Sequence, residues 1–148
     1  MGNLSYFLGI EVTRTGNDII LSQRKYIHEL LERANLSDIK PVSSPMAPNT
    51  HLALGDSAIF GDPVKYRQVV GALQYVTLTR PDITFAVNKV CQYMHSPTNN
   101  QWSAAKCILH YLQGTANFGL RLQHASGISL HAYTESAPSS LTGLYDAD

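Results

Sequence analysis

Acidic side chains near the two ends of the chain are the residues whose type could support metal-dependent chemistry. Glu11 and Asp18 lie near the start, and Asp146 and Asp148 lie in the final Tyr-Asp-Ala-Asp sequence. Phosphoryl transfer with two metal ions needs converging carboxylates that hold the ions about 3.5–4 Å apart. One carboxylate on a terminal strand binds Mg²⁺ no better than any surface carboxylate. Taken alone, these acidic residues therefore do not make up a metal site.

Histidine and cysteine add no recognisable catalytic or metal-binding pattern. The six histidines show no HExxH or similar ligand spacing. Cys91 and Cys107 each fall inside an expected helix, without a CxxC motif. We therefore expect two buried, reduced thiols in an intracellular protein.

Composition indicates a globular chain with an uneven charge distribution. Of 148 residues, 44% are hydrophobic, yet no apolar run approaches the roughly 18 residues of a membrane-spanning helix. The 11 basic and 11 acidic residues cancel overall, but residues 61–125 hold six bases and two acids. A basic middle could face phosphates, although so small a surplus is also typical of an ordinary solvated surface.

The first part of the chain predicts a β-hairpin followed by a helix. Residues 6–13 and 19–22 have the pattern of two strands, and residues 14–18 supply the Gly, Asn and Asp of a short loop. Ser22 can cap a helix that fades near Asn35. Residues 40–63 then contain four prolines and no clear period, which predicts an extended, exposed and mobile linker.

Three amphipathic helices are expected next. The first covers residues 66–78 and ends at the Thr-Arg-Pro-Asp sequence of residues 79–82, where the second begins; the second ends before Pro97. Residues 98–101 form a capping box for the third, whose apolar face includes Trp102 in the core, and Gly114 can stop it. Gly71 within the first helix indicates close crossing by a neighbour. Short strands at residues 119–123, 128–133 and 141–146 complete an α+β fold.

Three segments together resemble the Pol polyprotein of copia-type LTR retrotransposons. They are YFLGIEV at residues 6–12, RQVVGALQYVTLTRPDITFAVNKVCQYM at residues 67–94, and YDAD at residues 145–148. The resemblance implies an RNA-directed DNA polymerase with RNase H activity. It divides the chain into the end of the reverse transcriptase palm with its following helix (1–39), a linker (40–63), a thumb- and connection-like helical region (64–115), and connection strands running into the first RNase H strand (116–148).

The resemblance also implies a nucleic-acid surface. In the family, the hairpin that contains YFLGIEV steadies the 3′ end of the primer, and the matching residues include Phe7, Leu8 and Gly9. Lys89 and Lys106 lie opposite the apolar stripes of their helices and could face a template–primer duplex. The alternative for both is an ordinary solvated lysine.

Arg80 is the third basic candidate for a duplex contact. A local pair with Asp82, two residues further along the chain, is the alternative for its guanidinium. A chain with these contacts would bind RNA/DNA or DNA duplex weakly and without sequence preference, beside the remainder of the Pol polyprotein and away from any membrane.

Catalysis is not expected from this chain alone. The family carries its polymerase aspartates in a YxDD turn, which this sequence lacks. Asp146 matches the RNase H aspartate that binds catalytic Mg²⁺, and Asp148 matches the second aspartate of that motif. Glu135, in the similar sequence HAYTES, stands where an aspartate is expected, so either strand could take this position. We expect Mg²⁺ in the intact parent enzyme but not on this chain. The alternative function is a non-enzymatic helical binding module or a non-functional transposon remnant.

Overall fold

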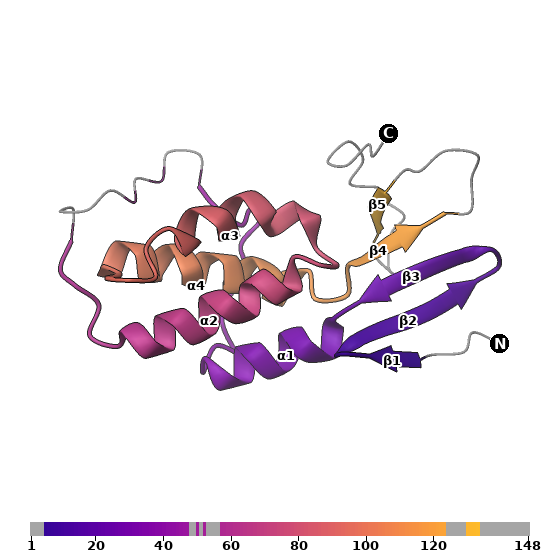
Figure 1. The fold of residues 1–148 in the computed structure, drawn as a ribbon, viewed down its shortest axis with the longest axis horizontal. Helices are drawn as coiled ribbons and strands as arrows, with labels where there is room; N and C mark the ends of the chain where they lie inside the picture. Colours follow the sequence, from indigo (N-terminus) through magenta and orange to yellow (C-terminus); the bar gives the residue numbers. More distant parts are fainter. Residues whose placement is uncertain (1–4, 48–49, 51, 53–56, 124–129, 134–148) are drawn as a thin grey trace.

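An antiparallel sheet and a group of packed helices lie side by side (Figure 1), which confirms the α+β class. The structure is a computed structural model and describes residues 5–47, 50, 52, 57–123 and 130–133. The strands are β1 (Ser5–Phe7), β2 (Ile10–Thr15), β3 (Asp18–Ser22), β4 (Gly119–Leu122) and β5 (Leu130–Tyr133). The helices are α1 (Arg24–Arg33), α2 (Pro63–Val76), the 3₁₀ helix η1 (Pro81–Ile83), α3 (Thr84–Cys91) and α4 (Asn99–Gly114).

The sheet follows the chain in the order β1-β2-β3-β4-β5, and every neighbouring pair is antiparallel. The single strand expected over residues 6–13 is wrong, because a turn at Leu8 and Gly9 divides it into β1 and β2. Both turn residues have positive φ, 54° and 82°, the combination that a type I′ hairpin turn requires. The next hairpin is tighter than expected, since Thr15 pairs with Asp18 across Gly16 and Asn17.

The helices form the core of the molecule. α1 packs on α2 and α4, and α3 packs on the same two helices. The apolar stripes of the sequence supply the buried side chains of α2, α3 and α4. Trp102 is an exception, since it lies partly exposed at the edge of the core and stacks on Phe60 with ring centroids 4.8 Å apart. None of the described helices is long and apolar enough to cross a membrane.

Local signals set most of the helix ends. The capping box of α4 is confirmed, with the Thr98 side chain accepting from the Gln101 N–H and the Gln101 side chain accepting from the Thr98 N–H. α2 begins earlier than expected, because the Asp62 side chain caps it and Pro63 occupies its first turn. α3 ends at Cys91, ahead of the expected stop before Pro97.

Most described residues of the proline-rich segment are exposed, as expected, but the segment also packs against α4 at particular residues. Leu52 is buried, and its carbonyl oxygen accepts a hydrogen bond of 2.7 Å from Gln101 Nε2. Pro41 lies against Gly114, where an added Cβ would come within 2.7 Å of the Pro41 Cβ. The segment therefore packs along α4, and Gly114 is needed for close approach as the last residue of that helix.

A buried arginine fixes the corner between α2 and η1. Arg80 has no exposed surface, and its Nε and Nη2 donate to the two Asp82 carboxylate oxygens at 3.0 and 2.8 Å. Its Nη1 donates to the Thr115 carbonyl at 2.8 Å, just after α4. Tyr111 donates to the same carboxylate at 2.7 Å, and Phe118 lies beneath the guanidinium at 5.1 Å. The corner is thereby joined to the end of α4.

The same corner is joined to the start of α1. The Thr79 hydroxyl donates to Gln23 Oε1 at 2.7 Å, and both side chains are fully buried. Gln23 Nε2 in turn donates to the Tyr75 carbonyl at 3.4 Å. Gln23 immediately follows β3, and Thr115 precedes β4 by a few residues. Both places where the chain passes between sheet and helices are therefore held at one corner.

Charge balance at this corner sets the pKa of Asp82. Burial alone would raise the pKa of its carboxyl, but the hydrogen bonds and charge of Arg80, with the hydrogen bond from Tyr111, outweigh burial and hold that pKa below its ordinary value. A lowered folded pKa stabilises the fold above the unfolded value of about 3.9, and this stabilisation is lost as pH falls through the folded value.

Replacing the arginine tests this corner. Arg80→Met should lower the free energy of unfolding by about 3–5 kcal/mol at neutral pH, because it leaves the Asp82 carboxylate buried without its partner. The difference from wild type should shrink as pH falls through the lowered folded pKa of Asp82, below which the carboxyl is protonated in both proteins. Urea unfolding at several pH values measures it. Arg67→Met, at an exposed position of α2, is the control and should cost less than about 1 kcal/mol. Equal small losses for both variants would contradict the role of Arg80.

Candidate nucleic-acid interface

The turn at Leu8 and Gly9 presents apolar side chains to solvent. Phe7 is 69% exposed and Leu8 73% exposed, although both are large hydrophobic residues. Leucine rarely adopts the positive φ found here, and such strain is typical of functional sites. At Gly9, an added Cβ would lie in ordinary contact with Tyr75 and Tyr26, at 3.6 and 3.8 Å, so positive φ rather than crowding favours glycine.

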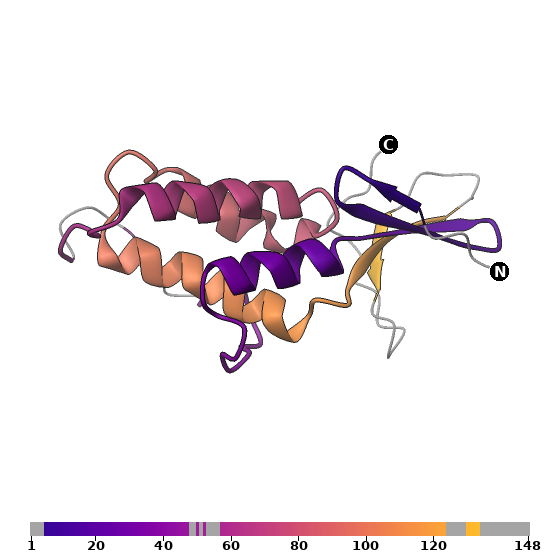
Figure 2. The same cartoon turned by 90° about the horizontal axis from the view of Figure 1, so that it is seen from below.

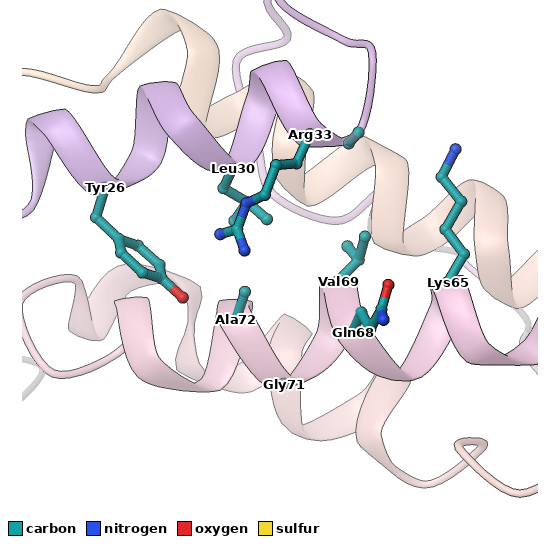
Figure 3. A pocket seen from close by; sticks show the side chains of 9 residues that line it. Tyr26, Leu30, Arg33, Lys65, Gln68, Val69, Gly71 and Ala72 are labelled. Atoms are coloured by element: carbon teal, nitrogen blue, oxygen red, sulfur yellow. The ribbon is translucent and has the colours of Figure 1, made fainter.

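A groove of about 480 Å³ runs between α1 and α2. Figure 3 shows the Arg33 guanidinium pointing from α1 toward α2, while Lys65 and Gln68 project from α2 on the same side. Gly71 lines this groove, and nothing lies within 4 Å of where its Cβ would be. The expected close crossing at Gly71 is therefore wrong, because the neighbouring helix leaves open space there.

The groove is basic and partly aromatic. Its described lining contains two cations and no carboxylate. Arg33 lies 5.8 Å from the centre of the Tyr26 ring, and Lys65 lies 5.7 Å from that of Trp102. Cations bind phosphate through charge-assisted hydrogen bonds, and an exposed amide such as that of Gln68 can donate to phosphate or sugar. This chemistry suits a polyanion.

The turn and the groove adjoin each other. Tyr26, at one end of the groove, packs edge-on against Tyr75 with ring centroids 5.0 Å apart, and Gly9 lies beside both rings. Lys65 marks the other end. The ten residue steps from Lys65 to Tyr75 span about 15 Å of helix. One strand of a duplex presents a phosphate about every 3.4 Å along the axis, so this length corresponds to roughly four phosphates.

The three basic candidates from the sequence lie elsewhere. Arg80 is buried in its pair with Asp82, so its proposed phosphate contact is corrected: the guanidinium is not on the surface. Lys89 is half-buried on α3, with its ammonium 5.1 Å from the Phe85 ring. Lys106 is half-buried on α4. Neither lysine lines the groove.

The described carboxylates do not form a metal site. Glu11 is buried, accepts a hydrogen bond of 3.2 Å from the Tyr6 hydroxyl and lies 3.8 Å from Arg24. Asp18 accepts a hydrogen bond of 2.9 Å from Arg121 Nε. No three His, Cys, Asp or Glu residues gather within the described ranges. The candidates Glu135, Asp146 and Asp148, with the expected strand at 141–146, lie outside those ranges.

Arg33 and Lys65 were not selected from the sequence. Arg33 shares a helix face with Tyr26 and Leu30, at spacings of seven and three residues, and this pattern could have drawn attention to it. No local sequence pattern predicts that Arg33 lies beside α2, because 29 residues separate the end of α1 from the start of α2. The groove is a product of tertiary packing.

Comparisons with known proteins identify relatives over most of the chain. It is 47% identical over 133 residues to a retrovirus-related Pol polyprotein from transposon RE2 of Arabidopsis thaliana, and 49% identical over 132 residues to that from transposon RE1. These matches cover 90% and 89% of this chain but 9% of each polyprotein. An uncharacterized mitochondrial protein of the same plant is 40% identical over 136 residues, covering 92% of this chain and 56% of that protein.

No family model matches the chain, and no solved structure matches it. The Pol relatives match about nine-tenths of it at nearly half identity, while it spans only 9% of their length. The chain therefore belongs to the Pol polyproteins of copia-type retrotransposons, of which it corresponds to a short segment.

Proposed function

We propose that this segment comes from the end of the reverse transcriptase and the start of RNase H, and that it grips a nucleic-acid duplex rather than performing chemistry. The motifs at residues 6–12 and 67–94 support the first part, as they match the family's primer-steadying hairpin and thumb-like helices. Within a Pol polyprotein, such a surface would hold the RNA/DNA or DNA duplex while other segments carry the catalytic carboxylates.

The observation that carries the proposal is the continuity of the Leu8–Gly9 turn with the α1–α2 groove. The turn offers an exposed apolar tip, and the groove adds Arg33 and Lys65 without an opposing acid in its described lining. Phosphates position a nucleic acid without reporting its sequence, whereas apolar and aromatic groups contact sugars or bases. A surface that combines both should bind duplexes with little sequence preference.

Lys89 and Lys106 remain candidates for an extension of this surface. Each sits half-buried on its own helix, outside the groove. A duplex is wide enough to touch more than one helix, so either lysine could add a peripheral phosphate contact. Their contribution to duplex binding should be smaller than that of Arg33 and Lys65, because they do not lie beside the aromatic and amide groups of the groove.

Magnesium chemistry does not fit the described residues. Glu11 and Asp18 each face an arginine, and they lie at opposite ends of the pairing between β2 and β3. An arginine beside each carboxylate already supplies the positive charge that a metal ion would bring. The described residues therefore favour binding over catalysis.

The salt dependence of binding tests whether this surface binds a nucleic-acid duplex. The chain should bind a labelled RNA/DNA hybrid with a dissociation constant of about 10⁻⁴–10⁻⁶ M at moderate salt, as non-specific binders do. Arg33→Glu/Lys65→Glu should weaken binding and reduce the slope of log affinity against log salt by about 1.8, or 0.9 for each lost phosphate contact. Fluorescence anisotropy at several salt concentrations gives both quantities.

Two further double variants separate the groove from general charge. Arg14→Glu/Lys40→Glu changes the same charge at two exposed positions outside the groove and should leave the slope nearly unchanged. Lys89→Glu/Lys106→Glu should lower the slope by less than the groove variant. If all three double variants lowered the slope equally, binding would depend on net charge alone. That result would contradict a defined duplex-binding surface at the groove.

A second prediction concerns catalysis. The purified chain should neither extend a primer with Mg²⁺ and dNTPs nor cleave RNA in a hybrid, because its carboxylate sets are incomplete. Extension and cleavage are measured on end-labelled substrates, with a Pol polyprotein carrying the full sites as positive control. Template-dependent activity that is lost in Asp146→Asn or Glu11→Gln would overturn the assignment.

A further inference from the structure

The register of the sheet gathers apolar side chains on one face. Paired residues point to the same side, and alternate residues point to opposite sides. The pairs Phe7–Ile10, Val12–Leu21, Leu21–Leu120 and Ile19–Leu122 therefore place seven hydrophobic residues together, with Arg14, the partner of Ile19, at the edge of the same side. We call this set the apolar face: Phe7, Ile10, Val12, Ile19, Leu21, Leu120 and Leu122.

The opposite face is mainly polar. It carries the hydrogen bond between Tyr6 and Glu11 and the ion pair between Asp18 and Arg121. Thr13 lies between them, opposite Ile20 of β3. A polar sheet face with its own ion pair can be exposed to solvent, whereas an apolar sheet face is normally buried under a second layer of helices or strands.

None of the described elements supplies that second layer. Ile19 and Leu21 lie on the central strand and have neighbours on both sides, yet both remain partly exposed. The residues of the apolar face are absent from the cluster that makes up the helical core. Figure 2 shows the helices beside the sheet rather than over it. Leu120 is buried at the end where β4 leaves the helices, and Phe7 at the far edge is 69% exposed.

The size of the apolar face indicates the kind of partner. Four strands, β1 to β4, spaced about 4.8 Å apart and with some four residues each, cover roughly 250 Å². A stable interface between separate proteins buries about 800 Å² on each partner, so this face alone does not hold a second copy of the chain. A segment of the same polypeptide meets a smaller requirement, because its tether gives a local concentration in the millimolar range.

We infer that the apolar face is covered by another segment of the Pol polyprotein, one that presents a matching apolar sheet or helix. The Pol relatives extend far beyond the matched region, which is 9% of their length, so ample chain exists to supply this layer. The inference rests on membership of the Pol family and on the sheet, and it does not depend on duplex binding.

Thiol labelling in two settings tests the inference. Single cysteines are introduced as Val12→Cys on the apolar face and Thr13→Cys on the polar face, both at half-buried positions of β2. Each variant is examined as the isolated chain and as a replacement for the matching 132-residue segment of the transposon RE1 Pol polyprotein. Maleimide labelling is followed by peptide mass analysis, which reports the natural Cys91 and Cys107 separately as references for folding.

In the isolated chain, both introduced cysteines should react at similar rates. In the polyprotein, Val12→Cys should react at least about tenfold more slowly while Thr13→Cys changes little, because a covered thiol is not reached by the reagent. Ile19→Cys and Thr15→Cys repeat the comparison at a second pair of positions, in case one variant disturbs the fold. Unchanged labelling of Val12→Cys and Ile19→Cys in the polyprotein would overturn the inference. Protection in the isolated chain would overturn it, in favour of a second copy if sedimentation shows a dimer and of this chain's own residues if it shows a monomer.

Discussion

The buried corner at residues 79–82 is the constraint on which the arrangement of the molecule depends. Arg80 joins it to the end of α4 and Thr79 joins it to the start of α1, so both crossings between sheet and helices are held by buried hydrogen bonds. Breaking such bonds leaves unpaired polar groups in a low-dielectric environment, which is costly. The corner thus fixes where the hairpin sits, and with it the position of the Leu8–Gly9 turn beside Tyr75.

Sequence patterns anticipated the features that are local. The apolar stripes of α2, α3 and α4 and the capping box at Thr98 depend on residues a few positions apart, and the structure contains them. Features that depend on distant partners were not accessible in this way. The Arg80–Thr115 contact spans 35 residues, and Gln101 reaches Leu52 across 49. The Leu8–Gly9 turn was not predicted for another reason, since leucine rarely adopts a positive φ.

The candidate site was predictable in part for the same reason. The motif around Phe7, Leu8 and Gly9 identified the hairpin, but the cations of the adjoining groove are Arg33 on α1 and Lys65 on α2 rather than Arg80. Arg33 and Lys65 meet only because α1 packs against α2. Selecting basic residues by local surplus therefore included one buried structural arginine and missed two residues of the groove.

The groove and the apolar face are two surfaces of this chain with different chemistry. One is basic and suits a nucleic-acid duplex, and the other is hydrophobic and suits another protein layer. They meet near β1, where Phe7 belongs to the apolar face and Leu8 to the exposed turn. The most direct test of the duplex surface is an NMR titration of the labelled chain with a short RNA/DNA hybrid at low salt. We expect the largest amide shifts at Leu8, at Gly9 and along the groove residues of α1 and α2, as one connected patch. Shifts confined to α3 and α4, or no shifts at saturating hybrid, would contradict the account.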